Sequence, residues 1–174
     1  APTKLAGQVL AAGVMAFQGV AIIWLPIGGT FVLDPLTSVL LTVIVVVVSI
    51  NAINFVDGLD GLAAGIVAVA AGAFFVYAYV LSVELGLQRA TLATLVSVVL
   101  VGMGLGFLPN NLFPARIFMG DTGSMLLGLL LAAATITLSG QVDPSALSSG
   151  VFLPTLLPLI LPFAVMALPL VDLI

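Results

Sequence analysis

The chain has 174 residues, of which 63% are hydrophobic and only 6% are charged, and its formal net charge is −4. A soluble domain has about a quarter charged residues, so this composition excludes a soluble globular protein and indicates an integral membrane protein. The small, scattered charge does not indicate a nucleic-acid partner, and none is expected. The absence of Cys and His excludes disulfides, thiolate metal sites and imidazole chemistry within these residues.

Six apolar segments are each long enough to cross a bilayer core, for which about 20 residues suffice. They are residues 9–25, 36–53, 62–83, 91–108, 123–139 and 151–170. The sequence therefore predicts an all-α fold, a polytopic transmembrane bundle of about six helices. No linker divides it, so residues 1–174 are expected to form a single transmembrane domain. Four glycines have the small-xxx-small spacing of close helix contacts: Gly61, Gly65, Gly102 and Gly106.

Six helices place the connecting segments alternately on two faces of the membrane. One face holds residues 1–8, 51–61, 109–122 and 171–174. Lys4 and Arg116 lie on this face and Arg89 on the other, so the positive-inside rule favours a cytoplasmic orientation for the first face. All the unusual polar clusters also lie there, and this face is where a functional site is expected.

The first cluster is NAINFVDGLDGLAAG, residues 51–65, which directly follows a long apolar run. Asn51, Asn54, Asp57 and Asp60 recur every three residues, and at about 100° per residue the first three share one face of a helix. The asparagines either face a common cavity or join helices through hydrogen bonds. The helix is expected to end near Asp57, where the helix dipole disfavours an acid unless a cation or donor is near. Asp60 has two interpretations, as the N-cap of the next helix and as an active-site acid.

The second cluster is FLPNNLFPARIFMGDTGSMLLG, residues 107–128. Pro109 is expected to stop a helix, and MGDTGS to begin the next one, capped by Asp121, Thr122 or Ser124. A helix amino terminus with glycines and hydroxyls is suited to phosphate. An acid beside a phosphate requires a divalent cation between them, and Mg²⁺ is commonly held by one or two carboxylates plus substrate phosphates.

Two further side chains of the second cluster each have two interpretations. Arg116 pairs with a phosphate or anchors the loop at lipid headgroups. Phe118 is an interfacial aromatic or stacks on a planar ligand, and the residues alone favour the interfacial role.

NAINFVDGLDGLAAG and PARIFMGDTGSMLLG resemble, over their whole length, the two signature motifs of the polyprenyl-phosphate N-acetylhexosamine-1-phosphate transferases. KLAGQ near the start resembles the segment after this family's aspartate-rich motif, and LPLVDLI at the end resembles the segment before its histidine-rich loop. The most similar branch is the bacterial UDP-N-acetylglucosamine type, and the muramoyl-pentapeptide transferase of peptidoglycan synthesis is the alternative. Since neither flanking motif is present, the chain is expected to be a piece truncated at both ends and inactive alone.

The resemblance implies transfer of an N-acetylhexosamine-1-phosphate from a UDP-amino-sugar to a polyprenyl phosphate, with release of UMP. It implies Mg²⁺ as cofactor, or Mn²⁺ in its place, and the initiating step of a cell-envelope polysaccharide as the role. The expected location is the bacterial plasma membrane, with the active site facing the cytoplasm, and a homodimer is compatible with the resemblance.

Carried over by position, the resemblance implies Asp121 as the first metal ligand, and Asn54 as a second metal ligand or a phosphate contact. Asp57 and Asp60 match the acids of the nucleotide-sugar site and are the candidate catalytic residues. Phe118 matches an aromatic residue that stacks on uracil in relatives, which reverses the preference drawn from the residues alone. The other candidate substrate contacts are Asn51, Asn111, Arg116, Gly120 and Lys4.

Two other classes of protein compete with this interpretation. A transporter or permease would use intramembrane acids near helix centres and often has an inverted repeat. A structural membrane subunit would use the same polar residues only to cap and pack helices. The acids cluster at one membrane interface and no repeat is visible, which favours the enzyme.

Overall fold

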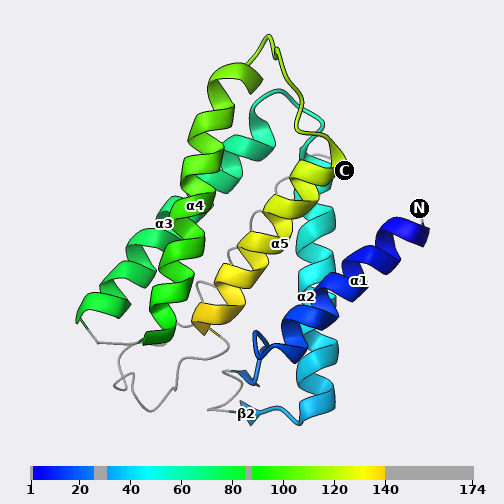
Figure 1. The fold of residues 1–174 in the computed structure, drawn as a ribbon, viewed down its shortest axis with the longest axis vertical. Helices are drawn as coiled ribbons and strands as arrows, with labels where there is room; N and C mark the ends of the chain where they lie inside the picture. Colours follow the sequence, from blue (N-terminus) through cyan, green and yellow to red (C-terminus); the bar gives the residue numbers. More distant parts are fainter. Residues whose placement is uncertain (1, 26–30, 85–87, 140–174) are drawn as a thin grey trace.

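The computed structural model describes residues 2–25, 31–84 and 88–139 (Figure 1). In this part of the chain the helices are α1 (Pro2–Phe17), α2 (Pro35–Val56), α3 (Leu62–Glu84), α4 (Gln88–Asn111) and α5 (Gly120–Ser139). Two short antiparallel strands, β1 (Trp24–Leu25) and β2 (Phe31–Val32), precede α2, with Trp24 opposite Val32.

Among the described residues, four helices are long and apolar enough to cross a membrane: Pro35–Val56, Leu62–Val83, Ala90–Asn111 and Gly120–Leu138. They coincide with four of the predicted segments, and the all-helical bundle fits a multi-pass membrane protein. The predicted segment 151–170 lies outside the described residues, so the structure does not confirm a count of six.

The predicted first span, residues 9–25, is wrong in its position. Helix α1 ends at Phe17, and Gly19 follows with a φ of 92°. The chain then folds against α2, where the Ile22 N–H donates to Thr42 Oγ1 at 2.9 Å and Ser38 Oγ donates to the Ile22 carbonyl at 2.7 Å. These two hydroxyls satisfy backbone groups that would otherwise require a continued helix.

The predicted helix ends around the two polar clusters are largely confirmed. Asp57 is the C-cap of α2, and its N–H donates to the Ile53 carbonyl at 3.2 Å. Helix α5 begins at Gly120, whose φ of 67° is in the left-handed region that favours glycine. Pro109 does not stop α4 as predicted, because the helix continues to Asn111 and the Leu112 N–H still bonds to the Leu108 carbonyl at 2.8 Å.

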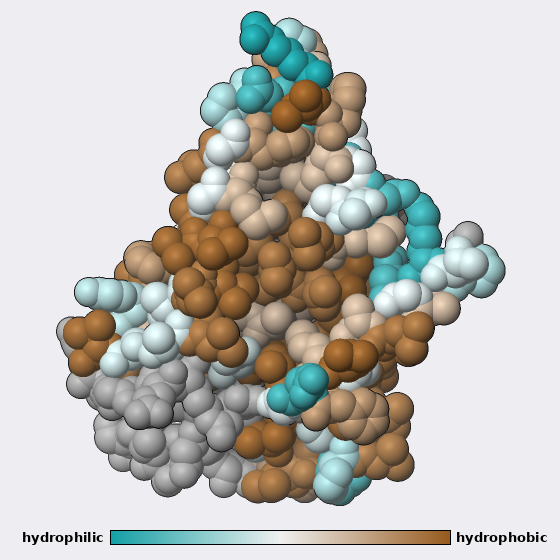
Figure 2. Space-filling view, viewed as in Figure 1, coloured by the Kyte–Doolittle hydropathy of each residue, from teal (hydrophilic) through white to brown (hydrophobic). Residues whose placement is uncertain are grey.

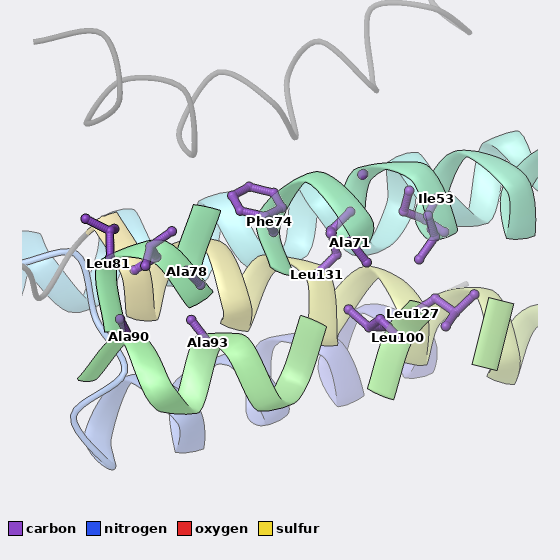
Figure 3. Close-up of a cluster of buried hydrophobic side chains, with 13 residues drawn as sticks. Ile53, Ala71, Phe74, Ala78, Leu81, Ala90, Ala93, Leu100, Leu127 and Leu131 are labelled. Carbon is purple, nitrogen blue, oxygen red and sulfur yellow. The ribbon is translucent and has the colours of Figure 1, made fainter. Parts of the chain in front are cut away.

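Helix α5 lies between two layers of the bundle, with α3 and α4 on one side and α1 and α2 on the other (Figure 1). One buried cluster gathers apolar side chains of α3, α4 and α5 between the helices, among them Phe74, Leu100 and Leu131 (Figure 3). A second cluster joins α1, α2 and α5 through residues such as Ala12 and Ile50. Because α5 contributes to both clusters, its amino end is held beside the ends of α1 and α2.

Of the four glycines predicted from spacing, only Gly61 has a close neighbour, since an added Cβ there would lie 2.9 Å from the Leu112 Cδ2, just after α4. An added Cβ would meet no neighbouring atom within 4 Å at three of them: Gly65, Gly102 and Gly106. The backbones approach instead at Gly104, where a Cβ would lie 2.8 Å from the Ala68 Cβ of α3. At Gly128 a Cβ would lie 2.7 Å from the Ile50 Cα of α2.

The hydropathy of the surface changes along the bundle (Figure 2). Hydrophobic side chains cover its middle, whereas hydrophilic ones gather at the end formed by the α2–α3 turn and the α4–α5 loop. The two polar clusters therefore share one end of the molecule, as predicted.

Candidate active site

A cleft of about 220 Å³ opens at the polar end of the bundle. Its lining comes from two segments, 54–60 at the α2–α3 turn and 111–121 at the α4–α5 loop. The acids Asp57, Asp60 and Asp121 all line it. Residues from the two sequence clusters therefore form one site.

Asn54 and Asp121 connect the two halves of the cleft. The Asn54 Nδ2 donates to Asp121 Oδ1 at 3.0 Å and to Ser124 Oγ at 2.8 Å. Ser124 is buried and donates to the Gly120 carbonyl at 3.2 Å, which fixes the start of α5. Asp121 lies in the first turn of α5, where the helix dipole favours an anion. The two residues predicted to bind metal thus lie together, and their metal role stays a prediction.

Lys4 of α1 joins the same group. Its ammonium forms an ion pair with the second carboxylate oxygen, Oδ2, of Asp121. Both side chains are about half exposed, at 54% and 53%, so water screens the pair and its contribution to stability is small. Three helices therefore place polar groups around one carboxylate.

Asp57 occupies an unfavourable electrostatic position. It caps the negative end of α2 and is partly buried. Burial raises the pKa of the Asp57 carboxyl; the Ser124 hydroxyl opposes this shift, and the negative charge of Asp121 adds to it. The cleft therefore holds two acids, Asp57 and Asp121, and Asp57 is partly removed from water. Their negative charges would stabilise a bound cation.

The side chain of Asp60 does not cap the amino terminus of α3, which was one of its two predicted roles. Its Oδ2 accepts a hydrogen bond of 3.0 Å from the Ala115 N–H in the α4–α5 loop. Gly61 directly precedes α3 and its carbonyl accepts the Gly65 N–H at 2.9 Å, so Gly61 takes the capping position. Asp60 therefore joins the two walls of the cleft.

Asn111 makes the second connection between these walls. Its Oδ1 accepts the Gly61 N–H at 3.1 Å, and its Nδ2 donates to the Ile117 carbonyl at 3.0 Å. The side chain is only 5% exposed, although it lines the cleft. Asn111 was predicted as a substrate contact, but the oxygen and the nitrogen of its side-chain amide both already hold the loop.

The other predicted contacts divide between the cleft and its surroundings. Phe118 and Gly120 line it, and Phe118 is 78% exposed, so one ring face is available to a ligand. Arg116 is exposed on the loop, outside the lining. Asn51 is also outside the lining, because its amide pairs with Gln8 of α1.

The sequence analysis missed Gln8. The available signal was its position four residues after Lys4 in an otherwise apolar helix, which puts both side chains on one face.

The donor set fits a divalent cation of the magnesium type. Within residues 2–25, 31–84 and 88–139 there is no cluster of three acids, histidines or cysteines that could hold a metal by itself. Mg²⁺ does not require one, since it keeps several waters and binds through one or two carboxylates and substrate phosphates. Asp121 provides such a carboxylate in the cleft, and the side-chain amide of Asn54 lies beside it, bonded through its nitrogen.

The comparison with known proteins identifies the family of the chain. The sequence matches the family "Glycosyl transferase family 4" over residues 1–139, and the chain belongs to that family.

The relatives that match nearly the whole chain have a more specific name than the family. Decaprenyl-phosphate N-acetylglucosaminephosphotransferase of Mycobacterium tuberculosis (strain CDC 1551 / Oshkosh) is 45% identical over 177 residues, which cover 99% of this chain and 44% of the relative. The protein of the same name from Mycobacterium leprae is 46% identical, with the same coverage. A phospho-N-acetylmuramoyl-pentapeptide-transferase of Desulfatibacillum aliphaticivorans is 44% identical over only 78 residues, 40% of this chain and 22% of that protein. The chain spans less than half the length of these relatives.

Proposed function

We propose that the complete protein transfers N-acetylglucosamine-1-phosphate from UDP-N-acetylglucosamine to a polyprenyl phosphate and releases UMP. One observation carries the proposal: two motifs that are distant in sequence form a single acidic cleft at the polar end of an apolar bundle. The similarity over 99% of the chain to proteins named decaprenyl-phosphate N-acetylglucosaminephosphotransferase supports it.

The location of the cleft suits the two substrates. The acceptor is a long lipid whose phosphate lies at the membrane surface, and the donor is water-soluble, so a cleft at the membrane boundary is accessible to both. In the reaction, an oxygen of the lipid phosphate attacks the sugar-bearing phosphorus of the UDP-sugar. The bond from that phosphorus to the bridging oxygen of UMP breaks, and UMP leaves with the electron pair. Such a transfer depends mainly on positioning and on neutralising charge.

The residues of the cleft divide this work. Asp121 and Asn54 hold Mg²⁺ or Mn²⁺ together with the substrate phosphates, and the bound cation supplies charge neutralisation. The Lys4 ammonium, which already lies at Asp121, contacts a phosphate oxygen when the cation is bound. Phe118 stacks on the uracil, and Asp57 and Asp60 accept hydrogen bonds from the nucleotide-sugar.

The orientation in the membrane follows from the same residues. Lys4, paired with Asp121, and Arg116 of the α4–α5 loop both lie at the cleft end of the bundle, which the positive-inside rule assigns to the cytoplasm. We therefore place the cleft on the cytoplasmic side of a bacterial plasma membrane, and the reaction at the start of a cell-envelope polysaccharide.

The test uses the full-length protein, polyprenyl phosphate and UDP-N-acetylglucosamine carrying ³²P on the sugar-bearing phosphate. The proposal predicts label in the lipid extract and unlabelled UMP in water. Release of UDP, with the label left in the aqueous phase, would contradict it. Transfer from UDP-N-acetylmuramoyl-pentapeptide alone would select the peptidoglycan alternative, and uptake of the sugar nucleotide into vesicles without a new lipid product would select a transporter.

A further inference from the structure

Two layers of polar contacts connect α1, α2 and α5, the first at the cleft and the second beneath it. The first layer consists of Lys4, Asn54 and Asp121. The second layer lies one helical turn deeper and consists of Gln8, Asn51 and Met125. On α1 and α5 the residues of the two layers are four positions apart, and on α2 they are three apart. Residues at these spacings lie on the same side of a helix, so each helix contributes to both layers from one side.

The second layer is built around a reciprocal amide pair. The Asn51 Nδ2 donates to Gln8 Oε1 at 2.8 Å, and the Gln8 Nε2 donates to Asn51 Oδ1 at 3.4 Å. The same Gln8 nitrogen lies 3.6 Å from the Met125 sulfur of α5. Gln8 is only 6% exposed, so the cost of leaving its amide unpaired is high.

The rest of the α1 interface offers few other polar contacts. Its buried apolar residues are the small Ala12 and Ala16, and Met15 packs partly buried against the same cluster. The Lys4–Asp121 pair is half exposed and too weak to hold a helix. Gln8, by contrast, is a buried polar side chain with partners on both α2 and α5, and a buried polar residue is a known means of fixing helix register.

We propose that Gln8 and Asn51 are positioning residues, whose amide pair fixes α1 so that the Lys4 ammonium stays at Asp121 beside the cleft. Gln8 is buried, and its two hydrogen bonds with Asn51 are directional, whereas the ion pair that they place is half exposed on both sides. Only the kinetic test of this proposal rests on the proposed function. The chemical test measures the reactivity of Lys4 and is independent of turnover.

The chemical test measures the rate at which an amine reagent modifies Lys4 in the full-length, membrane-embedded protein, by mass spectrometry of the Lys4 peptide. Gln8→Met and Asn51→Leu remove the pair while keeping side-chain size. Each should raise the rate at least threefold, toward the rate of Asp121→Asn, in which the partner of Lys4 is lost. Ser38→Ala is the matched control, because it removes a buried bond to the segment after α1 far from the cleft and should leave the rate unchanged.

Unchanged labelling of Lys4 in both Gln8→Met and Asn51→Leu overturns the proposal, and so does an equal rise in Ser38→Ala. If a single variant fails to assemble in the membrane, the double variant Gln8→Asn with Asn51→Gln, in which the two amides are exchanged, is labelled instead. Protection of Lys4 in this exchanged pair supports the proposal, and loss of protection overturns it.

The kinetic test asks whether the pair acts through Lys4. Gln8→Met should lower kcat/KM about tenfold in the natural background and have no further effect in a Lys4→Met background. Additive losses in the two backgrounds would mean a merely structural role and would overturn the proposal. If the natural protein shows no transfer at all, the proposed function fails while the labelling result still decides the positioning role.

Discussion

The side-chain amide of Asn54, at the end of α2, donates a hydrogen bond of 3.0 Å to the carboxylate of Asp121 in the first turn of α5. The two residues are 67 positions apart in the sequence. This contact joins the two polar motifs, and it makes the amino terminus of α5, Lys4 of α1 and the end of α2 parts of one site. The geometry of the cleft therefore depends on how α2 packs against α5.

Replacing Asp121 by Asn in the full-length protein should lower transfer activity by at least about 100-fold, because it removes the main charge that binds the cation. Folding should be retained, since the exposed ion pair contributes little to stability. The measurement is turnover against Mg²⁺ concentration. Asp34→Asn is the control, because it removes an acid that caps α2 at its other end and Asn caps equally well. Unchanged turnover in Asp121→Asn would exclude Asp121 as metal ligand.

Replacing Phe118 by Ala should weaken the binding of UMP, because the exposed ring lines the cleft. Stacking of a base on an aromatic ring contributes about 1–3 kcal/mol, which corresponds to a rise in Kd of about 5- to 150-fold. Calorimetric titration of the full-length protein measures it. Phe113→Ala is the matched control, since Phe113 is 86% exposed on the same loop but does not line the cleft. Equal effects of the two substitutions would count against stacking.

Replacing Asn111 by Ala should lower the free energy of unfolding by about 1–3 kcal/mol, because the Gly61 N–H and the Ile117 carbonyl both lose their partner. Thermal unfolding in detergent measures the loss. Asn110→Ala, at an exposed neighbouring position, should change stability by less than about 0.5 kcal/mol. If Asn111→Ala leaves stability unchanged and raises KM for the UDP-sugar, Asn111 is a substrate contact instead.

The stability of the metal-free protein should depend on the charge of Asp57. Burial raises the pKa of the Asp57 carboxyl above its ordinary value of 3.8 in the folded state. The folded protein then binds more protons than the unfolded chain, so the contribution of Asp57 is most favourable below pH 3.8 and becomes less favourable as pH rises through the folded pKa. Asp57→Asn should therefore raise Tm at pH 7 relative to the natural protein, and the difference should vanish well below pH 3.8, where the carboxyl is protonated in both the folded and the unfolded state.

Asp34 provides the control for this pH dependence with the opposite sign. Its hydrogen bonds with Thr37 lower the pKa of the Asp34 carboxyl, so its ionised form stabilises the folded state above the ordinary pKa. Asp34→Asn should lower Tm slightly at neutral pH and have no effect in acid. A difference in Tm for Asp57→Asn that does not vary with pH would contradict the assignment of charge and burial as its cause.

Replacing Gly128 by Ala should destabilise the bundle by about 1–3 kcal/mol, because the new Cβ would lie 2.7 Å from the Ile50 Cα of α2 and backbone atoms cannot rotate away. Gly102→Ala, where a Cβ meets no neighbouring atom within 4 Å, should leave stability equal or higher, since Ala is the better helix former. The free energies of unfolding of the two variants decide. Equal losses would mean that α2 and α5 are less closely packed.

The sequence predicted those parts of the fold and site that depend on local signals. The end of α2 at Asp57 and the start of α5 at Gly120 follow from glycines and acids after apolar runs. The common face of the two clusters follows from counting helices. The end of α1 could not be predicted, because residues 18–25 continue the apolar composition and turn back only through bonds to Ser38 and Thr42.

The sequence also could not predict how each membrane helix is rotated about its own axis. Gly102, Gly104 and Gly106 are equally apolar positions of α4, and only Gly104 meets α3. In a helix that is apolar on all sides, hydropathy does not tell which face is buried. Likewise, nothing near Asp60 in sequence indicates that its partner is the N–H of Ala115, 55 residues later.

The central claim is that the α2–α3 turn and the α4–α5 loop form one nucleotide-sugar site. A UDP-N-acetylglucosamine analogue with a photoreactive group on the uracil, added to the full-length protein in membranes, tests it most directly. We predict that labelled peptides come from both residues 51–61 and residues 109–122, and that UMP prevents labelling of both. Labelling confined to the opposite end of the bundle, near Asp34, or labelling that UMP does not prevent, would contradict the claim.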